Sequence, residues 1–538
     1  MSEEQLNGTM LQGFSWNLPA DGQHWRRLGQ MADRLVSEGI TSVWMPPAYK
    51  GQAGVRDVGY GVYDLWDLGE FDQRGGVATK YGTRREYVSA VVALKQSGID
   101  VLGDIVLNHK MGADEAEELM ARPVASDNRL YDMGPLEPIT AWTRFTFPGR
   151  AGELDDFVWD WTCFKGVDYD ASGERGGLWL FDGKAWDDDV SHEMGNYDYL
   201  MGVDVDLGNP DVYEQLVKWG AWYLEASGVD GFRLDAIKHM SRAFYTRWLA
   251  DMRAAAGREL FCVGEYWSPG VQDLVSYLGS EPDMSLFDVP LHFAFYQASV
   301  DREHIDFARM LDGAFVTADP VHAVTFVDNH DTQPNQALES TVQPWFKPVA
   351  YAVILLREAG YPCVFFADLF GLPSDATPAV AELPLLMEIR RRFAYGAQRD
   401  YFDDPSLVGW TREGDGSRVG SGVAAILWNQ PSPQDEGDAD ASGDAEDGDV
   451  EDGKAAPPVE EPQEAVPDQE ESLPTKAMCV GAHHAGETWQ CVLGDVASVE
   501  IDGEGVGRFP VSTTSMVAVY VPEDAVARLD HIPIVMSR

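Results

Sequence analysis

Short apolar segments that end in polar residues recur along the chain, and this recurrence constrains the fold more than any other feature. Stretches with apolar residues at i, i+3 and i+4 spacing separate several of them, as in 210–227, 240–256 and 347–359. Alternating strands and helices predict a parallel sheet with helical crossovers. Eight such strands fit a closed (β/α)₈ barrel, whose functional sites form at the carboxyl ends of the strands. The eight segments are 9–14, 41–47, 101–109, 231–236, 260–267, 284–291, 323–331 and 363–370.

Two parts of the chain break this alternation. The part after the third predicted strand is rich in Asp, Gly, Trp and Tyr and lacks helical periodicity, which predicts an inserted domain. Near the C-terminus, short apolar runs with Gly and Asp turns predict a C-terminal β-domain. The predicted boundaries are 1–109 and 211–393 for the barrel, 110–210 for the inserted domain and 394–538 for the C-terminal domain.

The chain is strongly acidic, with 89 Asp and Glu against 40 Lys and Arg over 538 residues, a formal net charge of −49. Its 45% hydrophobic content is enough for a large core, which excludes disorder of the whole chain. The segment 431–474 holds 16 acidic residues and one lysine, and we expect a disordered insert there. The charge argues against nucleic acid and anionic membrane surfaces as partners, because both repel a protein of this sign.

No targeting or redox signal is visible in the sequence. The start, MSEEQLNGTM, lacks the basic and apolar regions of a signal peptide, and no run of 18 uncharged apolar residues predicts a membrane span. The five cysteines form no CxxC pair. We therefore expect a cytoplasmic monomer, although a chain whose signal peptide had been removed would look the same.

Polar side chains gather where four of the predicted strands end. A single polar residue at a strand end is more often a cap or a turn residue. Four strand ends rich in carboxylates, imidazoles and an arginine indicate a functional site, because such charges are costly to group without a use. These residues are Asp104, Asn108 and His109, then Arg233, Asp235, Lys238 and His239, then Glu265 and Trp267, and finally Asp328, Asn329, His330 and Asp331.

Several carboxylates without a nucleotide-binding motif suggest glycoside cleavage. One carboxylate attacks the anomeric carbon and a second, protonated one gives its proton to the leaving oxygen. A third carboxylate stabilises the distorted sugar and keeps the acid protonated by like-charge repulsion. Arg233 and Asp235 are two residues apart on one predicted strand, so their side chains share a face. The arginine then holds the aspartate ionised, as a nucleophile requires.

Four of these segments resemble, in the right order, the conserved regions of the α-amylase family, glycoside hydrolase family 13. They read DIVLNH, GFRLDAIKH, VGEYW and FVDNHD. The opening sequence GTMLQGFSWNLPADGQHWRRL resembles the liquefying bacterial and cytoplasmic branch of that family. The resemblance runs from about Asn7 to Val521, apart from the acidic insert. It implies a (β/α)₈ barrel, an inserted domain B and a C-terminal β-sandwich, in agreement with the segmentation above.

The resemblance also implies a reaction, the retaining hydrolysis of internal α-1,4-glucosidic bonds in starch, glycogen or maltodextrins. By position, Asp235 matches the family's nucleophile, Glu265 its general acid/base and Asp331 its transition-state stabiliser. In a retaining enzyme the nucleophile and the acid lie about 5 Å apart. The residues that match sugar-binding positions are Tyr60, His109, Arg233, Lys238, His239, Trp267, His330 and Glu193.

A structural Ca²⁺ between the barrel and the inserted domain is implied in the same way. Its ligands match Asn108, Asp198, Asp204 and the backbone carbonyl of His239, and the three side chains are oxygen donors, as a hard cation requires. The liquefying branch often has a further calcium–sodium–calcium cluster, and two of its ligands match here. The sequence departs from that cluster elsewhere, so we predict one Ca²⁺ and not the full cluster. Asp187 and Asp206 match its ligands, whereas Lys165 and Gly208 replace aspartates. The ammonium of Lys165 is able to fill the sodium position.

Two alternatives stay open at this point. One is a transglycosylating or maltooligosaccharide-forming enzyme of the same family, because water and sugar acceptors compete for one covalent intermediate. The other is a non-catalytic glycan-binding protein. That alternative requires the loss of a catalytic carboxylate, and Asp235, Glu265 and Asp331 are all present.

Overall fold

The computed structural model describes residues 7–280, 282–372, 377–429 and 473–531. Eight parallel strands close into a barrel in the order β1-β16-β15-β14-β13-β12-β5-β2. Each of the eight predicted apolar segments overlaps one of these strands, so the predicted barrel is confirmed. The strands are β1 (Met10–Gln12), β2 (Ser42–Met45), β5 (Asp100–Ile105), β12 (Gly231–Leu234), β13 (Phe261–Gly264), β14 (Ser285–Phe287), β15 (Ala323–Phe326) and β16 (Tyr361–Phe365).

Local sequence signals begin and end the helices around the barrel. Helix α4 (Pro210–Ser227) begins after Asn209, whose side chain accepts a hydrogen bond from the Asp211 amide, and it ends at Gly228 with a left-handed φ of 72°. Helix α5 (Arg242–Ala256) has the same arrangement, with Ser241 at its start. The other helices are α1 (His24–Gln30), α2 (Ala32–Ser37), α3 (Arg84–Gln96), α6 (Val271–Leu278), α7 (Val289–Val300), α8 (Phe315–Ala318), α9 (Lys347–Leu356), α10 (Phe366–Phe370), α11 (Leu383–Arg392) and α12 (Glu523–Val526).

Some of the predicted element boundaries are wrong. The segment 363–370 was predicted as one strand, but α10 takes over after Phe365. The segment 284–291 likewise turns into α7, because Asp288 caps that helix by accepting a hydrogen bond from the Leu291 amide. The predicted helix 347–359 ends at Leu356, where the backbone of the next residue becomes extended. Continuous apolar sequence does not mark these changes, since both elements are buried.

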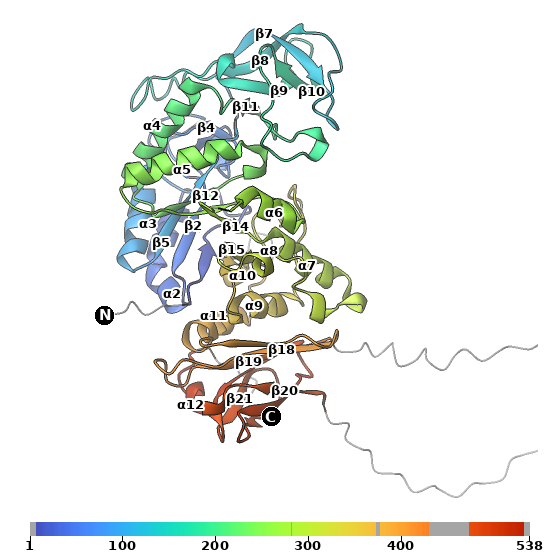
Figure 1. Ribbon diagram of the computed structural model, residues 1–538. Coiled ribbons are helices and arrows are strands. Elements are labelled where there is room, and N and C mark those ends of the chain that lie inside the picture. The colour runs from blue at the N-terminus through green and yellow to red at the C-terminus, as the bar shows by residue number, and fades with distance from the viewer. Residues whose placement is uncertain (1–6, 281, 373–376, 430–472, 532–538) are drawn as a thin grey trace, which may run out of the picture.

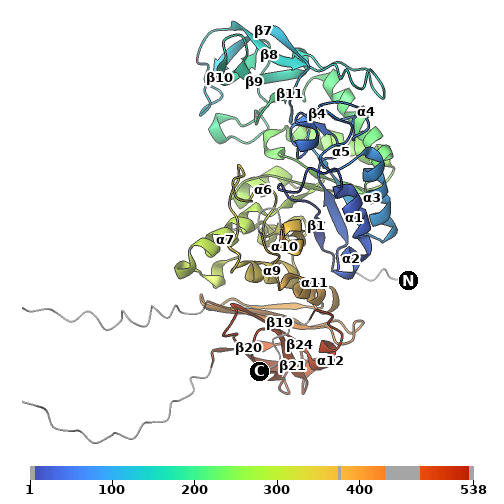
Figure 2. The ribbon, with the colours of Figure 1, turned by 180° about the vertical axis from the view of Figure 1, so that it is seen from behind.

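The region after β5 forms a separate sheet with strand order β6-β11-β9-β10-β7-β8. It lies at one end of the molecule in both views, beyond α4 and α5 (Figures 1 and 2). Two short strands of the preceding region, β3 (Lys50–Gly51) and β4 (Val62–Asp64), pair with each other. The strands of the inserted sheet are β6 (His109–Lys110), β7 (Glu115–Val124), β8 (Glu137–Arg144), β9 (Phe164–Asp170), β10 (Arg175–Phe181) and β11 (Val203–Val205).

The C-terminal region forms a second β-domain at the opposite end of the molecule (Figure 1). Six strands pair in the order β17-β18-β19-β24-β21-β22, and β20 pairs with β23. The predicted disordered insert 431–474 lies outside the described residues except for its last two. The strands are β17 (Gln398–Tyr401), β18 (Leu407–Arg412), β19 (Val423–Trp428), β20 (Thr475–Cys479), β21 (Thr488–Leu493), β22 (Val499–Glu500), β23 (Val506–Pro510) and β24 (Val517–Pro522).

One large apolar core joins the barrel, its helices and the base of the inserted sheet, and a smaller core lies inside the C-terminal domain. The barrel strands are buried along nearly their whole length, as expected for a parallel sheet covered by helices. In the part of the chain described here, no helix has both the length and the apolar character needed to cross a membrane.

Candidate active site

The side chain of Arg233 lies at the centre of the polar cluster predicted from the strand ends. It is fully buried on β12. Its Nη1 contacts Asp104 Oδ1 at 2.9 Å and Asp235 Oδ1 at 2.6 Å, while its Nη2 contacts Glu265 Oε2 at 2.5 Å. The guanidinium therefore gathers carboxylates from the ends of three neighbouring strands, and it gives Asp235 and Glu265 separate nitrogens.

Asp104 completes this arrangement; the sequence placed it among the polar residues at the strand ends but gave it no specific role. It lies opposite Arg233 in the register between β5 and β12. Its second oxygen, Oδ2, accepts hydrogen bonds from the Trp44 indole at 3.0 Å and from the Tyr60 hydroxyl at 2.7 Å. Asp104 thus fixes Arg233 and Tyr60 together. Its inward position in a buried strand is the one sequence signal for this role.

Burial controls the protonation of the acidic groups. It raises the pKa of Glu265 to about 8, with like-charge repulsion from Asp235 and Asp331 adding to the rise and Arg233 opposing it. Burial also raises the pKa of Asp331 to about 7, again against the pull of Arg233. Glu265 Oε1 is buried, and no residue that the structure describes forms a hydrogen bond with it. Glu265 is therefore suited to carry a proton at neutral pH and to present it to a ligand.

Aromatic and imidazole rings form a wall beside the carboxylates. The rings of Tyr60 and His330 stack with their centres 4.9 Å apart, and the ring of Trp16 stacks on Tyr60 with a centre-to-centre distance of 6.0 Å. The Gln12 amide donates to His330 Nδ1 at 3.0 Å, and His109 Nε2 donates to the Tyr60 carbonyl at 2.8 Å. Flat aromatic faces of this kind suit the apolar faces of sugar rings. Trp16 is a further residue that was not predicted, although it follows the first strand.

His330 also lies next to Asp331, with its Nε2 at 3.4 Å from Asp331 Oδ2. Burial first, and then Arg233, lower the pKa of His330 well below its ordinary value. The ring is therefore neutral and accepts the Gln12 hydrogen bond at Nδ1, which leaves Nε2–H as a donor on the side of Asp331.

Other predicted sugar-binding residues lie together at a neighbouring cavity of about 430 Å³. Lys238 Nζ contacts Glu193 Oε1 at 3.1 Å and donates to the Trp267 carbonyl at 2.8 Å. Both Lys238 and Glu193 line the cavity. His239 is not among the residues that line this cavity. Its Nδ1 donates a hydrogen bond to the Tyr197 carbonyl at 2.7 Å, so this nitrogen is not available to bind a sugar.

Two of the predicted calcium ligands, Asp198 and Asp204, lie beside the buried ammonium of Lys165. Its ammonium contacts Asp187 and Asp198, each at 2.7 Å. Asp204 is 1% exposed, and its Oδ2 has no hydrogen-bond partner among the described residues. Over the residues that the structure describes, no three His, Cys, Asp or Glu side chains converge as a metal site. The predicted set contains only two carboxylates beside an amide and a carbonyl, and the open oxygen of Asp204 suits a hard cation.

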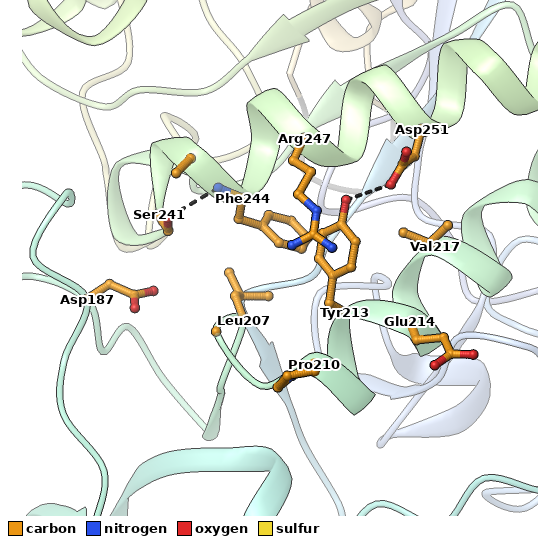
Figure 3. A pocket seen from close by; sticks show the side chains of 12 residues that line it. Asp187, Leu207, Pro210, Tyr213, Glu214, Val217, Ser241, Phe244, Arg247 and Asp251 are labelled. Carbon is orange, nitrogen blue, oxygen red and sulfur yellow. Dashed lines mark hydrogen bonds between the residues drawn. The ribbon is translucent and has the colours of Figure 1, made fainter.

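A second cavity, of about 690 Å³, lies outside this catalytic cluster between α4, α5 and the segment that returns from the inserted sheet. The Arg247 guanidinium lies 3.6 Å from the centre of the Tyr213 ring, and the Tyr213 hydroxyl donates to Asp251 at 2.7 Å (Figure 3). None of the lining residues comes from the Arg233 cluster. This cavity is therefore separate from the candidate active site.

Comparison with known proteins agrees with this geometry. Residues 30–372 match the family described as "Alpha amylase, catalytic domain". The chain is 45% identical to an α-amylase of Bacillus licheniformis over 522 residues, which cover 96% of this chain and 94% of the relative. It is 43% identical to a glucan 1,4-alpha-maltohexaosidase of Bacillus sp. (strain 707), with 95% and 92% covered.

Two further comparisons bear on location and fold. The chain is 44% identical to a cytoplasmic α-amylase of Escherichia coli (strain K12) over 425 residues, which cover 76% of this chain and 86% of the relative. A solved α-amylase of Geobacillus thermoleovorans, in complex with acarbose, has a TM-score of 0.57 at 14% identity, with 96% of this chain and 98% of that chain covered. That likeness concerns the fold alone. With the family match and these relatives, the chain belongs to the α-amylase family of glycoside hydrolases.

Proposed function

We propose that this protein is an endo-acting α-amylase that hydrolyses internal α-1,4-glucosidic bonds of starch, glycogen or maltodextrins with retention. The observation that carries the proposal is the Arg233 guanidinium, which holds Asp235 and Glu265 on separate nitrogens at 2.6 and 2.5 Å. A carboxyl group that keeps its proton, beside a second carboxylate that attacks, is the arrangement that retaining glycosidases need.

In the first step, an Asp235 carboxylate oxygen attacks the anomeric carbon while the bond to the leaving oxygen breaks. Glu265 gives its proton to that oxygen, so the leaving chain departs as a neutral alcohol. The raised pKa of Glu265, about 8, keeps this proton available at neutral pH. Asp331, as the third carboxylate, stabilises the positive charge that develops on the sugar ring.

In the second step, the ionised Glu265 takes a proton from water, and the water oxygen displaces Asp235 from the anomeric carbon. Two inversions give net retention. The stacked Tyr60 and His330 rings hold the sugar that is attacked, with His109 beside them. Lys238, Glu193 and Trp267 serve the sugars on the neighbouring side, and His239 supports them through its bond to Tyr197.

We also propose that Asn108, Asp198, Asp204 and the carbonyl of His239 hold one Ca²⁺. When bound, the ion supplies positive charge to oxygen ligands from both the barrel and the inserted region. The open Asp204 oxygen supports this assignment. Lys165 already neutralises part of the neighbouring carboxylate charge, which supports one ion rather than a larger metal cluster.

The remaining proposals concern location and domain limits. A cytoplasmic location is supported by the E. coli relative, whose name states it. The separate sheets support a barrel over 1–109 and 211–393, an inserted domain over 110–210 and a C-terminal domain over 394–538. A second candidate function, the release of maltohexaose, is favoured by the similarity to the Bacillus maltohexaosidase.

A time course of soluble starch digestion tests the main proposal. The wild-type chain should produce mixed reducing oligosaccharides with an early fall in polymer length, whereas steady accumulation of one product favours the second candidate. Asp235→Asn should abolish activity. Asp312→Asn is the matched control, because this aspartate is 67% exposed and contacts only Arg309 among the described ion pairs. Full activity of Asp235→Asn would overturn the assignment of the nucleophile.

A further inference from the structure

A second buried charge cluster lies behind the turn that carries Asp331, and the proposed mechanism leaves it unused. Lys347, the first residue of α9, contacts Asp328 Oδ2 at 2.8 Å and Asp368 Oδ1 at 2.5 Å. The Tyr351 hydroxyl donates to Asp368 Oδ2 at 2.7 Å. These four residues are at most 6% exposed. They come from the turn after β15, from α9 and from α10, so the cluster connects three parts of the barrel domain.

The cluster reaches the catalytic turn through Asp328. The Oδ1 atom of Asp328 accepts hydrogen bonds from the Thr332 hydroxyl at 2.9 Å and from the Val342 amide at 3.2 Å. Within the turn, Asn329 Oδ1 accepts from the Asp331 amide at 2.9 Å. Asp331 therefore lies in a turn that the buried Asp328 carboxylate closes through its bond to Thr332 and joins to the backbone at Val342.

A histidine holds the same turn from the other side. His292 Nδ1 donates to the Val327 carbonyl at 2.7 Å, and its Nε2 lies 2.9 Å from the Ser340 hydroxyl. Burial lowers the pKa of His292 to about 4, so the ring is neutral and adds no charge at neutral pH. Lys347 is accordingly the cation that compensates Asp328 and Asp368.

We propose that Lys347 is a positioning residue for Asp331. Its ammonium holds Asp328 against Asp368, and Asp328 in turn fixes the Asp331 turn relative to the Arg233 cluster. Without the ammonium, two buried carboxylates repel each other and Asp328 moves. Because Asp331 acts on the transition state, its displacement lowers kcat more than it weakens the binding of substrate.

This inference rests on the proposed function, so the first measurement is starch hydrolysis by the wild-type chain and by Asp235→Asn. An inactive wild type defeats the proposed function itself. Given an active wild type, Lys347→Met is expected to lower kcat on a maltooligosaccharide by about 10- to 100-fold, with KM changed less than about threefold. Its affinity for acarbose, a transition-state-like inhibitor, should fall by about the same factor as kcat/KM.

Two conservative variants keep the test decisive if Lys347→Met folds poorly. Lys347→Arg retains the charge and should recover most of the lost kcat. Tyr351→Phe removes one hydrogen bond to Asp368 and should lower kcat by a few-fold with KM unchanged. Unchanged kcat in both Lys347→Met and Tyr351→Phe would overturn the inference.

Arg150→Met is the matched control for the loss of a buried cation. Arg150 is 1% exposed and contacts Asp64 at 2.9 Å, away from the Asp331 turn. We expect it to lower the melting temperature while leaving kcat per folded molecule within about twofold. If Arg150→Met loses kcat and acarbose affinity as much as Lys347→Met does, the effect is general destabilisation and the inference is wrong.

Discussion

Two buried clusters in this molecule each place one basic side chain among three carboxylates, and they are completed differently. Around Arg233, the guanidinium contacts Asp104, Asp235 and Glu265 directly, at 2.9, 2.6 and 2.5 Å. Within the inserted sheet, Lys165 on β9 contacts two aspartates at 2.7 Å each. The third, Asp204, keeps a buried oxygen for which the described part of the chain offers no hydrogen-bond partner.

The geometry of the two cations explains this difference. A guanidinium offers five donors in a rigid plane, so it reaches several carboxylates at once, whereas an ammonium is a compact point charge. The Arg233 cluster disposes of its excess negative charge through the proton on Glu265, whose pKa is raised to about 8. The cluster around Lys165 leaves an open oxygen, and we propose that a metal ion satisfies it. We propose that one cluster serves proton transfer and that the other holds two parts of the chain together.

The largest expected effect comes from giving the first cluster the cation of the second. Arg233→Lys removes the planar fork, so one ammonium no longer reaches Asp104, Asp235 and Glu265 together. We expect kcat/KM on maltooligosaccharides to fall by at least about 1,000-fold. Arg247→Lys is the control, because this exposed arginine lies over the Tyr213 ring outside the cluster, and it should stay within about twofold of wild type. Comparable activity of both variants would contradict the central role of the guanidinium.

The next effect concerns stability rather than catalysis. Lys165→Ala leaves the buried carboxylates without their ammonium, which should cost about 3 kcal/mol of folding free energy and lower the melting temperature. Added Ca²⁺ should recover part of that loss, and a chelator should deepen it, because a cation then has more carboxylate charge to bind. Calorimetric melting with Ca²⁺ and with chelator measures both effects.

Lys184→Ala is the control for this experiment. Lys184 contacts Asp206 at 2.6 Å, but both side chains are partly exposed, at 15% and 17%. Its loss should cost less than about 1 kcal/mol and should not change the response to Ca²⁺. If Lys165→Ala melts at the same temperature with Ca²⁺ and with chelator, the proposed relation between the ammonium and the metal is wrong.

The sequence predicted the barrel and much of the Arg233 cluster because both follow from local patterns. Short apolar segments ending in polar residues placed the eight strands, and the two-residue spacing of Arg233 and Asp235 put both side chains on one face. Asp104 was harder to assign, because its contact with Arg233 depends on the register between β5 and β12. Lys347 was missed for a similar reason. It lies at a helix start that joins the site only after the barrel closes, and no local pattern marks it.

The smallest expected effect is a fall in kcat/KM of about tenfold per pH unit on the alkaline side. It distinguishes the two clusters because only the Arg233 cluster contains the proton on Glu265. Glu265, the proposed acid, is able to give a proton only in its protonated form, and its pKa of about 8 exceeds the ordinary value near 4.3. Activity should therefore persist through neutral pH and fall as the pH rises through about 8, seen as the alkaline limb of kcat/KM.

Asp331→Asn removes like-charge repulsion, so the limb of its residual activity should move to lower pH. Lys165→Ala should leave the limb in place, because Lys165 contacts none of the groups around Arg233. A limb that moves with Lys165→Ala but not with Asp331→Asn would show that the two clusters are not separate in function.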